Sequence, residues 1–483
     1  MGPFLLVRTI AIGTAVLAGL GAARVAGPPR VKIDTGSLEG LDTVGVMVFR
    51  GIPYARPPVG NLRWRPPLPA KAWRGVRMAK QLGRNCIQHQ PYSDIDPFAA
   101  GVSEDCLYLN VWTSALGTRA PLRPVMVWIH GGSFFAGFGG EERHNGARLA
   151  KKGAVVVTLN YRLGPFGFLA HPAFASESPY HAAGNYGLLD QTAALRWVKR
   201  NIARFGGDPS RVTIFGESVG GMSVALLMAS PLATGLFQRA ILESGPGVSS
   251  GVTPREIAQA TALQLAEQLH VRGTDAEAAR RLRALSPDTI LKAFLRRPQD
   301  APQLAPMIDG WVLPHAVDST LMSGPANLVP VIAGSNRDEG DEWIGAPTRA
   351  FARLVSARGV PTYLFMFSRV GEDSANRARG AYHSAEITFV FGRPHPILAD
   401  AGSTPYDATL ADAMSDYWVA FATSGDPNSP PAAGKWPRWP RYDRATDALL
   451  EFGPEIQPRT MVKRAMYDSL DAVARTHGQV RPR

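Results

Sequence analysis

Short apolar runs alternate with helix-like stretches along this chain, and no other feature limits the possible folds as strongly. Between two of the runs, residues 193–202 repeat small and apolar side chains at four-residue spacing, which is typical of a buried helix face. Residues 254–300 also look helical and are predicted to lie above the sheet. Short strands separated by helices predict a mostly parallel sheet that helices cover on both faces. Four runs have the length of buried strands: residues 125–129, 154–159, 211–215 and 329–333.

The composition is that of a large folded protein. Hydrophobic residues make up 45% of the 483 positions and charged residues only 19%, which excludes a disordered chain. Lys and Arg exceed Asp and Glu by 12, but they are spread along the chain and no motif for reading bases accompanies them. We therefore expect a solvated basic surface and no nucleic-acid partner. Residues 24–483 show no internal repeat and are predicted to form a single domain.

The N-terminus has the three parts of a secretory signal peptide. Arg8 is followed by fifteen uncharged residues that end in small side chains, with a cleavage site after Ala23. The run is short for a membrane span, which takes about 20 apolar residues. Residues 1–23 are therefore predicted to be removed on export, which leaves a secreted or periplasmic protein without a transmembrane anchor. An uncleaved anchor or an ordinary first helix is the alternative.

The chain has two cysteines, Cys86 and Cys106. Export would bring them into an oxidising compartment, where a disulfide could close a loop of 20 residues. In the chain-entropy account, such a bridge stabilises a fold by about 3 kcal/mol. Two free, buried thiols are equally compatible with these observations.

The motif Gly-Glu-Ser-Val-Gly-Gly at 216–221 predicts a nucleophilic serine. It follows the strand-like run 211–215 and precedes a helix-like stretch from Met222. A serine that projects from a tight strand-to-helix turn needs unusual backbone angles, and nearby glycines let the strand and the helix approach each other. The helix N-terminus adds a backbone N–H beside the nucleophile. Ser218 is therefore the predicted nucleophile.

A second glycine motif, His130-Gly131-Gly132, follows the strand-like run 125–129. An anionic tetrahedral intermediate needs two or three N–H donors, and paired glycines let the backbone come close enough to supply them. The alternative is a plain glycine turn at the end of a strand. Beside the serine motif we interpret the turn as an oxyanion loop, which His130 packs without titrating in catalysis.

These motifs lie among segments that together resemble the type-B carboxylesterases, the α/β-hydrolase family that includes the cholinesterases. The resemblance implies an α/β-hydrolase fold, with a large and mostly parallel central sheet flanked by helices. It also implies that Cys86 and Cys106 form the family's first disulfide loop. The matching segments extend over almost the whole chain after the signal and include residues 49–55, 103–110, 160–162, 184–191, 205–209, 308–310, 421–422, 425–428 and 436–437.

The resemblance also supplies the other members of a catalytic triad. Glu339 lies in the segment 338–340, which matches the segment that carries the family's acid, and His383 lies in 380–386, which matches the histidine segment. The chain order Ser218, Glu339, His383 is that of hydrolases with this fold. His383 would take the proton of Ser218, and Glu339 would fix the imidazole tautomer and stabilise its cation.

Five further residues receive roles by the same resemblance. The N–H groups of Gly131, Gly132 and Val219 would hold the oxyanion, and Glu217 and Ser244 would lie around the triad. No group of His, Cys and acidic residues has the spacing of metal ligands, so no metal and no cofactor is expected.

Three departures from the family pattern bear on the substrate. Val219 stands where the family usually has a small residue, which predicts a narrower acyl pocket. Residues 87–105 lack the tryptophan that stacks on quaternary ammonium in cholinesterases, so choline esters are not expected to be preferred. Glu339 and His383 are only 44 positions apart, which predicts reduced gorge-wall helices between 340 and 361. The site would then be more open, or completed by another subunit.

The motifs and the resemblance together predict an exported serine carboxylesterase. It would hydrolyse small to medium uncharged esters through an acyl-enzyme intermediate. Amide, thioester and polymer-ester hydrolases share the same nucleophile, base and oxyanion loop, and they remain alternatives. A non-catalytic binding protein on the same scaffold is a further alternative, although such proteins typically lose a triad residue and this chain retains all three.

Overall fold

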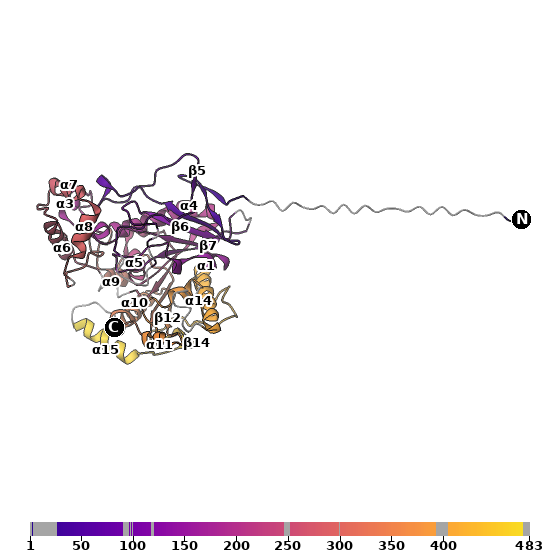
Figure 1. The fold of residues 1–483 in the computed structure, drawn as a ribbon. Coiled ribbons are helices and arrows are strands. Elements are labelled where there is room, and N and C mark those ends of the chain that lie inside the picture. The colour runs from indigo at the N-terminus through magenta and orange to yellow at the C-terminus, as the bar shows by residue number, and fades with distance from the viewer. Residues whose placement is uncertain are drawn as a thin grey trace.

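Figure 1 shows the fold of the chain in a computed structural model. The predicted signal peptide, residues 1–23, lies outside the described residues except for Gly2. None of the helices in the described part combines the length and hydrophobicity that a bilayer span requires. The structure describes residues 2, 27–89, 96, 98, 100–116, 120–245, 252–298, 300–392 and 404–476.

An eleven-stranded mixed sheet runs through the molecule in the order β14-β13-β12-β11-β10-β9-β7-β8-β6-β4-β3 (Figure 1). The strands from β13 to β8 are parallel to one another, and the strands at both edges are antiparallel. The four predicted strands are confirmed as β7, β8, β9 and β11, all in the parallel part. The sheet consists of β3 (Leu41–Asp42), β4 (Met47–Pro53), β6 (Tyr108–Thr113), β7 (Arg123–Ile129), β8 (Val155–Leu159), β9 (Gly207–Glu217), β10 (Arg239–Glu243), β11 (Val331–Asn336), β12 (Thr362–Phe367), β13 (Leu449–Phe452) and β14 (Ile456–Arg459). A smaller sheet contains β1 (Arg30–Ile33), β2 (Gly36–Glu39) and β5 (Val76–Met78).

Successive side chains of the central strands enter two different cores. Val127 of β7 joins a core that includes Leu195 and Val224, from helices on one face of the sheet. Its neighbour Trp128 joins a second core that includes Trp418, from a helix on the other face. Because alternate residues of a strand point to opposite faces, a sheet covered on both sides needs continuous apolar strands. This is why the strands read as unbroken apolar runs.

Helices α4 and α5 cover one face of the sheet, and α14 covers the other. The helical region predicted at 254–300 is confirmed as α6, α7 and α8, which lie together at one end of the molecule (Figure 1). The α-helices are α1 (Ala147–Lys151), α2 (Gly164–Phe168), α3 (Pro172–Ser176), α4 (Tyr186–Asn201), α5 (Val219–Ala229), α6 (Arg255–Gln268), α7 (Ala276–Ala284), α8 (Pro287–Leu295), α9 (Val317–Ser323), α10 (Ala346–Ala357), α11 (Ser374–Arg379), α12 (Ile387–Val390), α14 (Pro405–Ser424) and α15 (Arg464–Thr476). The short 3-10 helices are η1 (Gly60–Leu62), η2 (Glu142–His144), η3 (Ile202–Phe205) and η4 (Pro231–Ala233).

The segment for which the sequence predicts reduced gorge-wall helices holds a single π-helical turn and one longer helix. The π-helix η5 (Asp341–Gly345) follows Glu339 almost directly, and α10 continues from it. Trp343 on η5 is 66% exposed, whereas Phe351 of α10 is buried in the core. The chain thus returns to the sheet at β12 by a short path.

Cys86 and Cys106 form a disulfide, with the two sulfurs 2.05 Å apart. The alternative of two free thiols is therefore wrong. Both cysteines are buried in the larger core, so the bridge fastens both ends of the loop between them to the interior.

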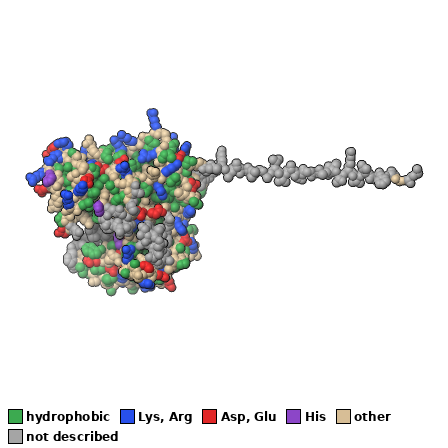
Figure 2. Space-filling model, viewed as in Figure 1, with side chains coloured by type: hydrophobic (Ala, Val, Ile, Leu, Met, Phe, Trp, Pro, Cys, Tyr) green, Lys and Arg blue, Asp and Glu red, His purple; other side chains and the backbone are tan. Residues whose placement is uncertain are grey.

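Charged side chains of both signs are mixed on the surface. Figure 2 shows one face of the molecule, where Lys and Arg lie among Asp and Glu and form no single patch. Some arginines are buried in ion pairs, such as Arg162 with Asp190 at 2.7 Å and Arg63 with Glu104 at 2.6 Å. Part of the basic excess therefore supports the fold.

Candidate active site

Ser218 lies at the turn between β9 and α5, with φ 57° and ψ −128°. A Cβ on Gly216 or Gly220 would lie 2.4 Å or 2.1 Å from the carbonyl oxygen of Ile129. The turn can therefore approach β7 only because both positions are glycine. A non-glycine residue in such a conformation is strained, and strain of this kind is concentrated at functional sites. The structure thus holds Ser218 in the conformation that its motif predicts.

The loop after β7 lies directly against this serine. A Cβ on Gly131 would lie 3.1 Å from the Cβ of Ser218 and 2.9 Å from the carbonyl oxygen of Glu217. Gly132 has φ +100°, and a Cβ there would lie 2.3 Å from the carbonyl oxygen of Ala136. Glycine is required at both positions because neither has room for a side chain.

His130 packs against this loop. Its ring stacks on Tyr161 with the centroids 4.4 Å apart, and its Nδ1 lies 2.8 Å from the carbonyl oxygen of Gly131. The Tyr161 hydroxyl donates to the carbonyl oxygen of His130 at 2.9 Å. Burial lowers the pKa of His130 to about 4. The imidazole is therefore neutral at physiological pH and supports the loop by packing.

The structure brings His383 and Glu339 together. His383 Nδ1 lies 2.7 Å from Glu339 Oε2, and the backbone N–H of Asn336 donates to Glu339 Oε1 at 2.5 Å. The two loops are joined beside this contact: Ala381 N donates to Asp338 Oδ2 at 2.7 Å, and Asp338 N donates to the carbonyl oxygen of Ala381 at 3.1 Å. Asp338 thus fastens the loop around Glu339 (residues 337–341, the acid loop) to the loop around His383 (residues 380–386, the histidine loop).

The other ring nitrogen of His383 faces the serine turn. Its Nε2 lies 3.2 Å from Oε1 of Glu217. Glu217 is the residue directly before Ser218 in the chain. Between the described side chains of Ser218 and His383 themselves the structure has no hydrogen bond. Catalytic hydrogen bonds are often long or poorly aligned before substrate binds, so the absence of this bond is compatible with proton transfer between the two side chains. The His383 side chain is 40% exposed, which leaves it accessible from solvent.

Three carboxylates act on this histidine, those of Glu217, Glu339 and Glu386, and a fourth, Glu243, interacts with Glu386 and Glu217. Glu217, Glu243 and Glu386 are buried, as is the side chain of Glu339; we call these four residues the acid cluster. Burial alone would lower the pKa of His383, but the negative charges of Glu217, Glu339 and Glu386 outweigh it and raise the pKa to about 10. Burial and then repulsion from the other carboxylates raise the pKa of Glu386 to about 8. Burial and the charge of Glu386 raise the pKa of Glu243 well above its usual range.

Hydrogen bonds hold the deeper acids of the cluster in place. Ser244 Oγ donates to Glu386 Oε1 at 3.4 Å, and Asn336 Nδ2 donates to Glu386 Oε2 at 2.5 Å. Trp418 Nε1 donates to Glu243 Oε1 at 2.8 Å. The side-chain hydrogen bond of Ser244 is to Glu386, and none of the hydrogen bonds between described residues joins Ser244 to Ser218, Glu339 or His383.

Glu243 and Glu386 were not among the predicted site residues. Glu386 lies three positions after His383, directly before α12, and Glu243 ends the apolar strand β10 beside β9. The available signals were an acid at the end of a buried strand and an acid three positions after His383. Neither signal shows that the carboxylate is buried. In the part of the chain that the structure describes, no three His, Cys, Asp or Glu side chains are arranged to hold a metal ion.

The carboxylesterase family model matches residues 27–345 and 340–470 of the chain. The chain belongs to the carboxylesterase family. This carboxylesterase is 36% identical over 494 residues to the fumonisin B1 esterase of Sphingopyxis macrogoltabida, covering 90% of this chain and 88% of that protein. It is 35% identical to the para-nitrobenzyl esterase of Bacillus subtilis, covering 89% of this chain and 97% of that relative.

Solved structures confirm the predicted α/β-hydrolase fold. A PNB esterase structure superimposes with a TM-score of 0.80 at 31% identity, covering 91% of this carboxylesterase and 99% of the other chain. A Geobacillus stearothermophilus carboxylesterase gives a TM-score of 0.79 at 32% identity with the same coverage. The family and these likenesses identify the protein as a serine carboxylesterase that hydrolyses esters.

Proposed function

We propose that this carboxylesterase hydrolyses small to medium uncharged esters through an acyl-enzyme on Ser218, with His383 as base and Glu339 as acid. The observation that carries the proposal is the 2.7 Å contact between His383 Nδ1 and Glu339 Oε2. This contact turns the other ring nitrogen, Nε2, toward the turn of residues 217 and 218. The imidazole is thereby oriented for proton transfer with the serine.

The reaction has two matching halves. His383 Nε2 takes the proton of Ser218 as the serine oxygen bonds to the carbonyl carbon of the ester. The tetrahedral intermediate then collapses, the C–O bond to the alcohol breaks, and the alcohol leaves with the proton from His383. Water attacks the acyl-enzyme in the same way and releases the carboxylic acid. Glu339 stabilises the imidazolium formed in each half.

The oxyanion is held in this proposal by the N–H groups of Gly131, Gly132 and Val219. Gly131 lies against Ser218, and Val219 begins α5, whose N-terminal dipole favours negative charge. Ser133 is an additional candidate, because Gly132, Ser133 and Phe134 have positive φ in succession. Left-handed residues of this kind direct neighbouring N–H groups into one concavity.

The proposed location of the mature enzyme is the periplasm or the extracellular space. The Cys86–Cys106 disulfide supports export, because such bonds persist in oxidising compartments. The apolar run after Arg8 and the small residues before Ala23 support a cleaved signal. Amino-terminal sequencing of the exported protein tests this directly.

The decisive experiment is hydrolysis of 4-nitrophenyl esters from acetate to decanoate by the wild-type protein and by Ser218→Ala. Loss of a triad member should lower turnover by roughly 10⁴ to 10⁶. Ser223→Ala is the matched control, since it removes the same oxygen from the same helix and should retain turnover. Equal turnover by wild type and Ser218→Ala would contradict the proposal.

The same ester series tests the acyl pocket. Val219 is half-buried beside Ser218 and packs against the larger core, so its branched side chain takes space next to the acyl group. Val219→Ala should raise kcat/KM for longer acyl chains relative to acetate. An acyl-length profile that matches the wild type would show that Val219 does not limit the pocket.

A wider panel separates the alternatives. The proposed nucleophile, base and oxyanion loop could also cleave an amide, a thioester or a polymer ester. Analogues of these three kinds should therefore be tested beside the best 4-nitrophenyl ester. Fumonisin B1 belongs in the panel because one relative is named for that ester. A higher kcat/KM for an amide or thioester than for the matched ester would reassign the substrate class and leave the triad in place.

A further inference from the structure

The helix α15, drawn in yellow in Figure 1, contacts Asp341 in the loop after Glu339, although it comes more than 120 positions later in the chain. Lys463, directly before α15, donates from Nζ to the carbonyl oxygen of Arg337 at 2.7 Å. The same ammonium donates to Asp341 Oδ1 at 2.7 Å and Oδ2 at 3.0 Å. Arg337 and Asp341 flank Glu339 by two positions on either side. One amine therefore ties together both ends of the acid loop.

Tyr467, one turn into α15, holds the same loop from a second point. Its hydroxyl donates to Asp341 Oδ1 at 2.8 Å. A Cβ on Gly345 would lie 2.4 Å from this hydroxyl, so the contact forms only because η5 has a glycine there. Burial, and then the charges of Asp341 and Glu339, raise the pKa of Tyr467 above its ordinary value. The hydroxyl therefore stays protonated and remains a donor.

The backbone that presents Lys463 is strained. Met461 and Lys463 have φ of 55° and 54°, in the left-handed region that disfavours residues with a side chain. Such conformations persist where the surrounding structure fixes them. At Lys463 the fixing contacts are those to Arg337 and Asp341, since they bind the end of its side chain.

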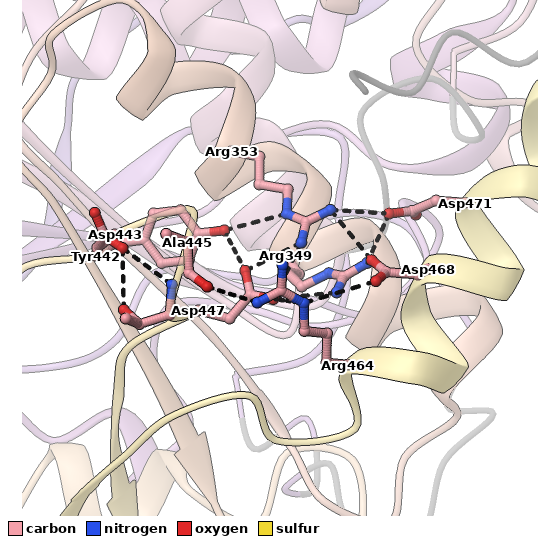
Figure 3. A network of polar contacts seen from close by, with 10 residues as sticks. Arg349, Arg353, Tyr442, Asp443, Ala445, Asp447, Arg464, Asp468 and Asp471 are labelled. Atoms are coloured by element: carbon pink, nitrogen blue, oxygen red, sulfur yellow. Dashed lines mark hydrogen bonds and ion pairs between the residues drawn. The ribbon is translucent and has the colours of Figure 1, made fainter.

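The rest of α15 is anchored to α10 by a partly buried network of ion pairs, which Figure 3 shows from close by. Arg349 of α10, itself buried, donates to Asp468 and Asp471 of α15 at 2.8 Å each. Arg349 and Arg353 also pair with Asp447, at 3.3 Å and 3.0 Å. Because α10 continues directly from η5, the acid loop and α15 share one rigid support.

We propose that Lys463 and Tyr467 are positioning residues for Glu339, and that docking of α15 sets the orientation of the acid toward His383. This inference rests on the roles proposed above for Glu339 and His383. The contacts form a continuous path: α15 holds the carbonyl of Arg337 and the side chain of Asp341, these hold the backbone of Glu339, and Glu339 holds His383 Nδ1. Asp338 joins this loop to the histidine loop, and α15 with Lys463 braces it from the side of Asp341.

The test compares Lys463→Met, Tyr467→Phe and the conservative Lys463→Arg on the best 4-nitrophenyl ester. Lys463→Met should lower kcat by about tenfold to a hundredfold, as small misplacements of catalytic groups do, and leave KM within about twofold. Its acid limb in the kcat–pH profile should move to lower pH, because a misaligned Glu339 stabilises the imidazolium less. Tyr467→Phe should act in the same direction, and Lys463→Arg should recover most of the kcat.

Lys80→Met is the matched control, since Lys80 makes a comparable ion pair with Glu39 at 2.6 Å, far from the acid loop in the chain. It should change neither kcat nor the pH profile. In a Glu339→Gln background, Lys463→Met should cause no further loss, because its effect passes through the acid. An equal loss in both backgrounds, or unchanged kcat and pH profile in a folded Lys463→Met, would overturn the inference.

The two proposals fail in different ways. Turnover that depends on Ser218 but is unaffected by Lys463→Met and Tyr467→Phe overturns only the positioning role. Turnover equal in wild type and Ser218→Ala overturns the proposed function, and the positioning role with it. A parallel loss of folded protein and activity in Lys463→Met, without a loss in folded Tyr467→Phe, also overturns it.

Discussion

At the scale of single residues, the negative charge around His383 determines the pH at which it can act. The imidazole accepts a proton only in its neutral form, and the carboxylates of Glu217, Glu339 and Glu386 raise its pKa to about 10 against the lowering effect of burial. The largest of the raising charges is that of Glu217, whose Oε1 lies 3.2 Å from Nε2. Activity should therefore rise with pH through a limb well above the ordinary histidine value of about 6.5.

The substitution Glu217→Gln removes this charge and keeps the shape of the side chain. The pKa of His383 should fall, so that more imidazole is neutral at a given pH and the acid limb of kcat/KM moves to lower pH. We expect the acid limb to move by at least about one pH unit, which corresponds to a loss of about 1.36 kcal/mol of interaction between the imidazolium and Glu217. The measurement is kcat/KM from pH 5 to 10. A limb at the wild-type position would mean that Glu217 does not govern the titration.

The residue scale also shows the limits of sequence-based prediction. Ser218 could be predicted from its glycines, because the turn that it needs has a steric signature. Glu339 and His383 could be found only through the family resemblance, since acids and histidines carry no local signature of their own. Glu386 was missed because an acid in a sequence gives no sign that it is buried against other acids.

At the scale of elements, the parallel strands and the helices of residues 254–300 were predictable, and the π-helix η5 was not. The runs at 125–129 and 211–215 are apolar throughout because both faces of β7 and β9 are covered, so burial itself left a readable pattern. The π-helix η5 has no such pattern, because its shape depends on contacts with Tyr467 and Lys463 far along the chain. Long-range contacts of this kind have no counterpart in local sequence.

The disulfide loop is an element whose stability contribution can be measured. Replacing Cys86 and Cys106 together by serine opens a loop of 20 residues in the unfolded chain. The free energy of unfolding should fall by about 3 kcal/mol. Denaturant unfolding of the double variant beside oxidised and reduced wild-type protein provides the measurement. A decrease below about 1 kcal/mol would show that the loop is held by its packing and not by the bond.

At the scale of the whole molecule, net charge and the missing tryptophan disfavour cationic substrates. The chain carries a formal charge of +12, and residues 87–105 contain no tryptophan for stacking on quaternary ammonium. Butyrylcholine should therefore give a lower kcat/KM than 3,3-dimethylbutyl butyrate, which has the same shape without the charge. The difference should shrink as salt is added, since screening weakens the field of the protein. A higher kcat/KM for butyrylcholine would contradict this account.

The position of α15 in the chain has a consequence for biosynthesis. The serine turn is complete once β10 is made, and the histidine loop follows, yet the contacts that brace the acid come from residues 463 and 467. A growing polypeptide would therefore possess nucleophile and base well before it possesses the brace. A polypeptide that stops before residue 463 would therefore lack the brace, and it should hydrolyse esters more slowly, by the tenfold to hundredfold expected of Lys463→Met.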